Sequence, residues 1–185
     1  MTLLIFTDID GTFINNDTFD EGLNTKTISE LAKAQHSVVF NTSKTFEEVD
    51  YFQKKIKTSL SFICETGGGI YIANDNLKTT ESSRAAYQIL YESRKITEYK
   101  DQIQSEIYKN FRDDLTFFDD LSVEEQSSLS GLSGHDLALA SRRDFSILIN
   151  WKSTKSKYNE FKLFLKKFKL NLITGGRFSH ICSEH

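Results

Sequence analysis

Two carboxylates spaced two residues apart, Asp8 and Asp10, are the side chains of this sequence best suited to chemistry. Residues two apart in an extended backbone point to the same side, so both carboxylates can converge on one point. One acid can then act as a nucleophile and the other as a general acid, and a hard cation such as Mg²⁺ would stabilise the pair. The structural alternative is an aspartate-rich turn whose side chains only accept hydrogen bonds from nearby amides.

A strand must hold these acids in place, and the apolar run at residues 3–6 directly precedes them. A continuous apolar run is typical of a strand buried on both faces of a parallel sheet. Gly11 then permits a sharp turn. Open parallel sheets bind ligands beyond the carboxyl ends of their strands, which is where Asp8 and Asp10 would lie.

A second polar group, Thr42, Ser43 and Lys44, follows a second predicted buried strand at residues 37–41. Thr45 and Glu48 have the spacing of a capping box, which predicts that a helix begins directly after this group. Hydroxyls, backbone amides, a helix N-terminus and an ammonium in one turn suit a phosphate group. The alternative is a capped turn with a solvated lysine.

The remaining pattern of the first part indicates an α/β sheet. A helix near residues 25–35, with a capping box at Thr27 and Glu30, precedes the second strand, and a third strand is expected at residues 61–64. The three glycines at 67–69 then predict a tight hairpin or a bulge before a strand at residues 70–73. Strand, helix, strand, helix, strand favours a right-handed parallel α/β core.

The second part has a different pattern, after a polar stretch at residues 74–86 that reads as a linker. Strands are expected at 87–91, 115–118 and 145–150, with helices between them, of which two begin at Ser122 and Ser133. A hairpin turning at Gly175-Gly176 would close the chain. We therefore expect two domains, an α/β core at residues 1–80 and an α+β unit at residues 81–185.

The composition excludes several partners. With 185 residues and a formal net charge of −3, the chain has no basic footprint for nucleic acid or for an anionic membrane. The first residues do not resemble a signal peptide, and no apolar run is long enough to span a membrane. Cys64 and Cys182 are far apart in apolar runs, which predicts buried free thiols in the reducing cytoplasm.

The string Asp-Ile-Asp-Gly-Thr at residues 8–12 resembles the first motif of the haloacid dehalogenase superfamily of phosphotransferases. The resemblance implies that Asp8 is the nucleophile that accepts the phosphoryl group. It implies that Asp10 protonates the leaving oxygen and later activates water. It also implies Mg²⁺ as a cofactor, held by the Asp8 carboxylate and the Asp10 carbonyl.

Five further strings, at residues 42–45, 65–68, 130–138, 141–146 and 175–178, look like those of mannosyl-3-phosphoglycerate phosphatases. This resemblance implies an α+β cap inserted into the core and a small phosphorylated sugar-glycerate as substrate, with another sugar phosphate as the alternative. Thr42, flanked by Ser43 and Lys44, would bind a phosphoryl oxygen. The substrate's carboxylate or sugar would face arginines of the cap, at Arg142, Arg143 and Arg177. The alternative for these arginines is a structural role at a helix end and a hairpin corner.

The chain departs from this pattern in several places. Thr66 replaces the asparagine of the usual Glu-Asn-Gly, and Ile147 replaces the glutamate of Ser-Glu-Pro. The family's core lysine, its second acidic pair and its last core strands have no counterpart before His185, so the sequence predicts an incomplete core. A catalytically impaired binding or interaction protein is therefore the rival function. The uncovered sheet would also favour a homo-oligomer.

Overall fold

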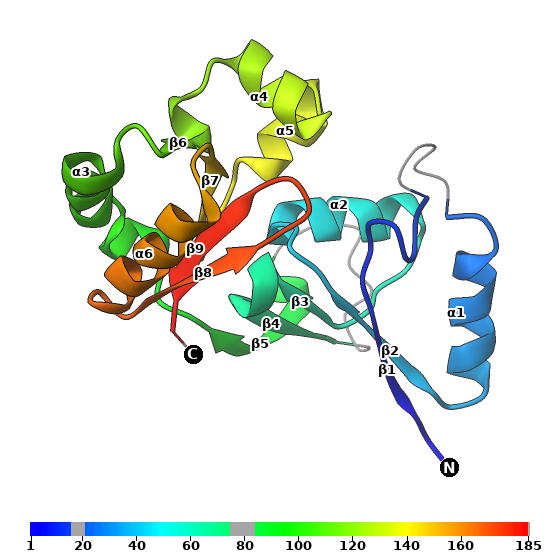
Figure 1. Cartoon of the computed structure of the whole chain (residues 1–185). Coiled ribbons are helices and arrows are strands. Elements are labelled where there is room, and N and C mark those ends of the chain that lie inside the picture. The colour runs from blue at the N-terminus through cyan, green and yellow to red at the C-terminus, as the bar shows by residue number, and fades with distance from the viewer. Residues whose placement is uncertain (16–20, 75–83, 185) are drawn as a thin grey trace. The chain divides into compact units, whose positions relative to one another are not determined.

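The computed structural model describes residues 1–15, 21–74 and 84–184 (Figure 1). The chain divides into two compact units, Met1–Glu92 and Ser93–His185. Most of the expected linker at residues 74–86 lies outside the described residues. Because the first unit extends to Glu92, the strand expected at residues 87–91 belongs to it, beyond the boundary suggested at residue 80. The roles of core and cap for the two parts remain a prediction.

The first unit contains a five-stranded sheet in the order β1-β2-β3-β4-β5. The strands β1 (Leu4–Thr7), β2 (Ser37–Asn41) and β3 (Phe62–Cys64) run parallel, as the sequence predicts. The strands β4 (Gly69–Ala73) and β5 (Tyr87–Glu92) then continue the sheet antiparallel. A short 3₁₀ turn, η1 (Glu65–Gly67), connects β3 to β4, and η2 (Arg84–Ala86) precedes β5. The expected hairpin after β3 is confirmed.

Two helices cover one face of this sheet. Ile28 of α1 (Asn24–Lys33) and Val49 of α2 (Phe46–Lys55) pack in one cluster with Phe40 of β2. Thr45 and Glu48 form the predicted reciprocal capping box at the start of α2. The capping box predicted at Thr27 is wrong, because α1 already begins at Asn24 and the Thr27 hydroxyl instead donates to the Leu23 carbonyl.

The opposite face of the sheet is uncovered at β1, which corrects the expectation of a strand buried on both faces. Side chains alternate along a strand. Leu4 and Phe6 therefore point away from the helices, and they are 61% and 55% exposed. Ile5, between them, packs against the helix-covered core. Since both crossover helices lie on one side, nothing in the described part of the first unit covers Leu4 and Phe6.

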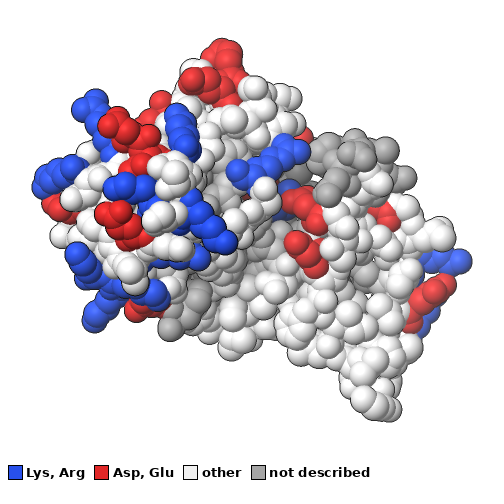
Figure 2. Space-filling view, viewed as in Figure 1, with Lys and Arg blue, Asp and Glu red and all other residues white. Residues whose placement is uncertain are grey.

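We expect this face of β1 to drive self-association. Figure 2 shows no charged side chain where β1 reaches the surface. Parallel sheets are normally covered on both faces, and an apolar strand without charges is poorly protected against pairing with another strand. Light scattering should therefore show a mass that rises with concentration. Leu4→Lys with Phe6→Glu should restore the monomer mass of 21.3 kDa, and a wild-type chain that stays monomeric would contradict this expectation.

The second unit is built on a four-stranded antiparallel sheet in the order β6-β7-β9-β8. Its strands are β6 (Leu115–Phe117), β7 (Ser146–Trp151), β8 (Leu170–Thr174) and β9 (Ser179–Ser183). The 3₁₀ turns η3 (Ile96–Glu98) and η4 (Phe118–Asp120) flank helix α3 (Lys100–Phe111) and β6. The predicted hairpin of β8 and β9 is confirmed, but its turn lies one residue later than expected. Thr174 pairs with Ser179, and the Gly175 amide donates to the Phe178 carbonyl at 2.8 Å, which places Gly176 and Arg177 at the turn.

Helices cover both faces of this second sheet. Ile103 of α3 and Phe161 of α6 (Lys155–Lys166) pack with Ile149 of β7 in the main cluster. Leu137 of α5 (Gly134–Ala140) packs with Leu148 on the other side of β7. The helices predicted to begin at Ser122 and Ser133 are both present. Ser122 forms a reciprocal capping box with Glu125 at the start of α4 (Val123–Ser130), whereas the Ser133 side chain makes no capping hydrogen bond. The α/β fold class is confirmed. Across the described residues, no helix is long and apolar enough to cross a membrane.

Candidate active site

The two carboxylates lie in a tight turn at the carboxyl end of β1. The Ile9 amide donates to Oδ1 of Asp8 at 2.7 Å, which orients that carboxylate. The carbonyl of Ile9 accepts from the amides of Phe13 and Ile14 at 3.0 and 2.9 Å, and Gly11 takes a positive φ of 69° to close the turn. The Ile9 side chain is fully buried, whereas Asp8 and Asp10 are exposed. The turn is thus anchored in the core and presents both acids to solvent.

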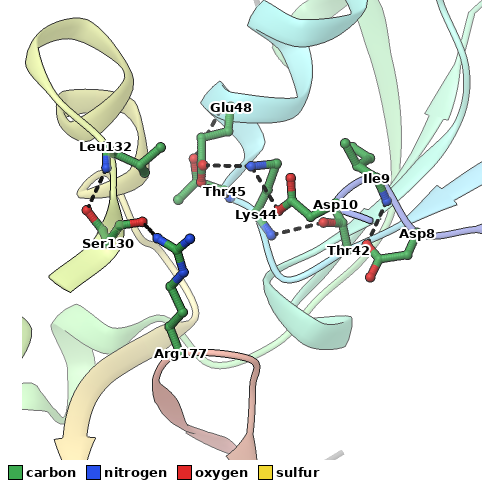
Figure 3. A network of polar contacts seen from close by, with 10 residues as sticks. All are labelled: Asp8, Ile9, Asp10, Thr42, Lys44, Thr45, Glu48, Ser130, Leu132 and Arg177. Atoms are coloured by element: carbon green, nitrogen blue, oxygen red, sulfur yellow. Dashed lines mark hydrogen bonds and ion pairs between the residues drawn. The ribbon is translucent and has the colours of Figure 1, made fainter. Parts of the chain in front are cut away.

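Lys44 lies beside the second acid (Figure 3). Its Nζ is 3.1 Å from Oδ2 of Asp10 and 3.5 Å from Oε1 of Glu48. Burial lowers the pKa of Lys44, but the charges of Glu48 and Asp10 more than offset that, so the net pKa is raised. Lys44 therefore carries a fixed positive charge in the turn. The sequence did not single out Glu48 as a partner of Lys44, although four-residue spacing across a helix start favours that contact.

The turn that carries Lys44 is tied to the neighbouring strand. Thr42 is buried, its amide donates to the Ile63 carbonyl at 3.0 Å, and its Oγ1 accepts from the Lys44 amide at 3.3 Å. The next turn binds to this one, since the amides of Thr66 and Glu65 donate to the carbonyls of Thr42 and Lys44 at 3.1 and 2.9 Å. The three turns after β1, β2 and β3 thus follow one another along the same edge of the sheet.

The oxygen ligands of this edge fit Mg²⁺. Among the described residues Oδ2 of Asp8 has no hydrogen-bond partner, and a carboxylate is the ligand that Mg²⁺ prefers. The described chain contains no group of three or more His, Cys, Asp or Glu that could hold a metal. Mg²⁺ does not need such a group, because it commonly binds through one or two carboxylates, substrate phosphate and water.

The three arginines predicted to bind substrate all lie in the second unit. Arg177 donates from Nη1 to the carbonyl of Ser130, the last residue of α4. Gly131 follows Ser130 with a φ of 75°, a conformation that glycine adopts without strain. The contact with Ser130 joins Arg177, at the corner of the hairpin formed by β8 and β9, to the end of α4.

Arg142 and Arg143 are adjacent but differ in environment. Arg143 donates from Nε to Oγ of Ser146 at 2.9 Å, whereas the Arg142 side chain is exposed at the end of α5. His180 of β9 is 6% exposed, and burial together with the charge of Arg143 lowers its pKa to about 3. The sequence did not single out His180. Its proximity to Arg143 depends on the register of β9 against β7, which pairs His180 with Leu148.

We expect His180 to make the second unit sensitive to acid. Its folded pKa of about 3 lies below the unfolded value of 6.5, so the unfolded chain binds the proton first as the pH falls. The free energy of unfolding should therefore fall by up to about 1.4 kcal/mol per pH unit below pH 6.5. Denaturant titrations of His180→Gln should show a smaller fall than wild type. The control, His135→Gln, replaces an exposed histidine of α5, and an equal fall in all three proteins would contradict this.

The chain is similar to known proteins over most of its length. The family model described as haloacid dehalogenase-like hydrolase matches residues 5–170 of the chain. The chain belongs to this family. The sequence-based assignment to the haloacid dehalogenase superfamily is thus confirmed.

Relatives of this haloacid dehalogenase-like chain include two proteins named glucosyl-3-phosphoglycerate/mannosyl-3-phosphoglycerate phosphatase. The protein from Methanococcoides burtonii is 26% identical over 100% of this chain and 69% of its own length. The protein from Persephonella marina is 28% identical over 98% of this chain and 67% of its own length.

Solved structures share the fold. A Streptococcus mutans protein aligns with a TM-score of 0.66 and 16% identity, over 97% of this chain and 70% of that one. A haloacid dehalogenase-like hydrolase from B. subtilis aligns with a TM-score of 0.62 and 12% identity, over 97% of this chain and 73% of that one. At these identities the likeness concerns the fold alone.

Proposed function

We propose that this chain is a Mg²⁺-dependent phosphomonoester hydrolase whose substrate is a phosphorylated sugar-glycerate, with mannosyl-3-phosphoglycerate as the first candidate. The observation that carries the proposal is the turn at the end of β1, which holds Asp8 beside Asp10 and Asp10 against Lys44 at 3.1 Å. Membership of the hydrolase family and the names of the two relatives support the reaction class and the substrate.

The proposed reaction has two steps. In the first, an oxygen of Asp8 forms a bond to phosphorus while the ester bond to the leaving oxygen breaks, and Asp10 gives its proton to that oxygen. In the second, Asp10 takes a proton from water, which attacks phosphorus and releases phosphate from Asp8. Thr42, Ser43 and Lys44 would bind phosphoryl oxygens through hydroxyls, amides and the ammonium.

Mg²⁺ would be held by the carboxylate of Asp8 and the main-chain carbonyl of Asp10, and when bound it would neutralise phosphoryl charge. Arg142, Arg143 and Arg177 are proposed to recognise the carboxylate or sugar of the substrate, since guanidinium groups suit bidentate contacts with carboxylates. We propose the cytoplasm as the setting, supported by Cys64 and Cys182, two buried cysteines that are not in a disulfide.

The proposal is tested by phosphate release from three esters: mannosyl-3-phosphoglycerate, its glucosyl counterpart and p-nitrophenyl phosphate. We expect release from all three in Mg²⁺ and loss of release in excess EDTA, with kcat/KM highest for a sugar-glycerate ester. A higher kcat/KM for an unrelated sugar phosphate would change the substrate but keep the reaction. Calorimetric phosphate binding without turnover of any ester would favour the rival function, a binding protein.

A further inference from the structure

The turn after β3 has a strained backbone. Glu65, Thr66 and Gly67 all have positive φ values, of 46°, 60° and 94°. Gly67 tolerates this conformation, but Thr66 is β-branched, and at φ 60° and ψ 40° its side chain crowds the backbone. A β-branched residue held in this region signals a constraint imposed by the surrounding structure, and such residues are concentrated at ligand sites.

Thr66 also carries an unsatisfied polar group. Its Oγ1 is buried and has no hydrogen-bond partner among the described residues. Burying a hydroxyl without a partner costs free energy, and most buried hydroxyls in folded proteins have one. Thr66 is therefore unfavourable in two respects, its backbone conformation and its unpaired hydroxyl.

The turn is joined to the proposed phosphate-binding turn by two backbone hydrogen bonds. The Thr66 amide donates to the Thr42 carbonyl at 3.1 Å, and the Glu65 amide donates to the Lys44 carbonyl at 2.9 Å. Glu65 itself is only 1% exposed, which anchors the turn in the core. Thr66 is thus held at a fixed place beside Thr42 and Lys44.

The strand order indicates which part of a substrate would reach Thr66. Parallel strands lie about 4.8 Å apart, so the turn after β3 is roughly 10 Å from the turn after β1, with Thr42 between them. In phosphoryl transfer the leaving oxygen departs opposite the nucleophile. The phosphoryl oxygens bound at Thr42 and Lys44 lie at right angles to this axis. The turn after β3 is hydrogen-bonded to both residues, so it borders the phosphoryl site where a leaving group larger than the phosphoryl group can contact it.

We infer that the Thr66 hydroxyl is a specificity-determining group that hydrogen-bonds a hydroxyl or carboxylate oxygen of the leaving group. This inference rests on the proposed function. An oxygen-rich leaving group would satisfy Oγ1, whereas an aromatic one such as p-nitrophenol offers it no comparable partner. Thr66 would act on discrimination between esters and not on the chemistry at phosphorus.

Thr66→Val is the sharpest variant, because valine keeps the shape and the β-branch and removes only the hydroxyl. We expect it to raise KM for mannosyl-3-phosphoglycerate about tenfold more than KM for p-nitrophenyl phosphate, the range expected for one lost hydrogen bond. The melting temperature should stay equal or rise, because an unpaired hydroxyl is removed. Thr66→Ser, which retains the hydroxyl, should keep the wild-type ratio of the two KM values.

The matched control is Thr25→Val in α1, since Oγ1 of Thr25 is also buried without a partner among the described residues but lies outside the three turns. It should leave the KM ratio unchanged. An unchanged ratio in Thr66→Val, or a fall in its melting temperature with equal losses for both esters, would overturn the inference. Wild-type protein that hydrolyses no ester would overturn the proposed function instead. Calorimetry with 3-phosphoglycerate against inorganic phosphate would then decide whether Thr66→Val weakens only the former, as the inference requires.

Discussion

Asp8→Asn is expected to lower kcat for phosphate release by on the order of 10³-fold or more, because an amide oxygen cannot replace the carboxylate as nucleophile. Asparagine has nearly the same shape, and its amide oxygen can still accept the Ile9 amide hydrogen bond of 2.7 Å. The turn should therefore stay folded, with a melting temperature close to that of wild type. Steady-state kinetics with p-nitrophenyl phosphate measures the loss.

The control for this variant is Asp50→Asn in α2. Asp50 makes an ion pair with Lys54 at 3.3 Å and belongs to the same unit, away from the turn that holds Asp8. It should keep wild-type kcat and KM. Full activity in Asp8→Asn, with normal Mg²⁺ dependence, would show that Asp8 is not the nucleophile.

Asp10→Asn is expected to lower kcat/KM to a different extent for esters with different leaving groups. For mannosyl-3-phosphoglycerate the leaving alkoxide needs a proton, so kcat/KM should fall by roughly 10² to 10⁴-fold. For p-nitrophenyl phosphate the leaving phenolate is stable without a proton. Its kcat/KM, which reports formation of the phosphoenzyme, should fall much less, while kcat falls because water attack still needs the base.

The ion pair between Asp10 and Lys44 calls for a separate control. Glu48→Gln also removes a carboxylate from Lys44, and glutamine still supports the capping box with Thr45. A similar loss in Glu48→Gln would assign the effect to the charge of Lys44. Equal losses of kcat/KM for both esters in Asp10→Asn would contradict its role as the acid.

Short sequence motifs predicted several helix ends correctly. The Thr45–Glu48 and Ser122–Glu125 pairs both form reciprocal capping boxes, and Gly131 ends α4 with the positive φ that glycine adopts easily. The same spacing at Thr27 and Glu30 failed, because a helix that starts earlier also contains it. Residue types three apart do not show where a helix begins.

Features that depend on distant segments could not be predicted. The apolar run at residues 3–6 indicates a strand but not what covers each face, and α1 and α2 cover only one. The contact of Arg177 with Ser130 and the environment of His180 depend on strand register and loop closure across the second unit. The positions of the candidate site residues could be predicted more fully. Asp8, Asp10, Thr42 and Lys44 follow adjacent strands, and the parallel topology brings their turns together.

The central claim is that Asp8 carries the phosphoryl group between the two steps, and trapping tests it most directly. The protein is mixed with p-nitrophenyl phosphate and Mg²⁺, quenched in acid within one turnover and digested for peptide mass spectrometry. We expect the mass of one phosphoryl group on the peptide that contains Asp8, in greater yield in Asp10→Asn and absent in Asp8→Asn. The account would be contradicted if the wild-type protein released phosphate and no phosphoryl group were found on Asp8, or if the phosphoryl group were found on another residue.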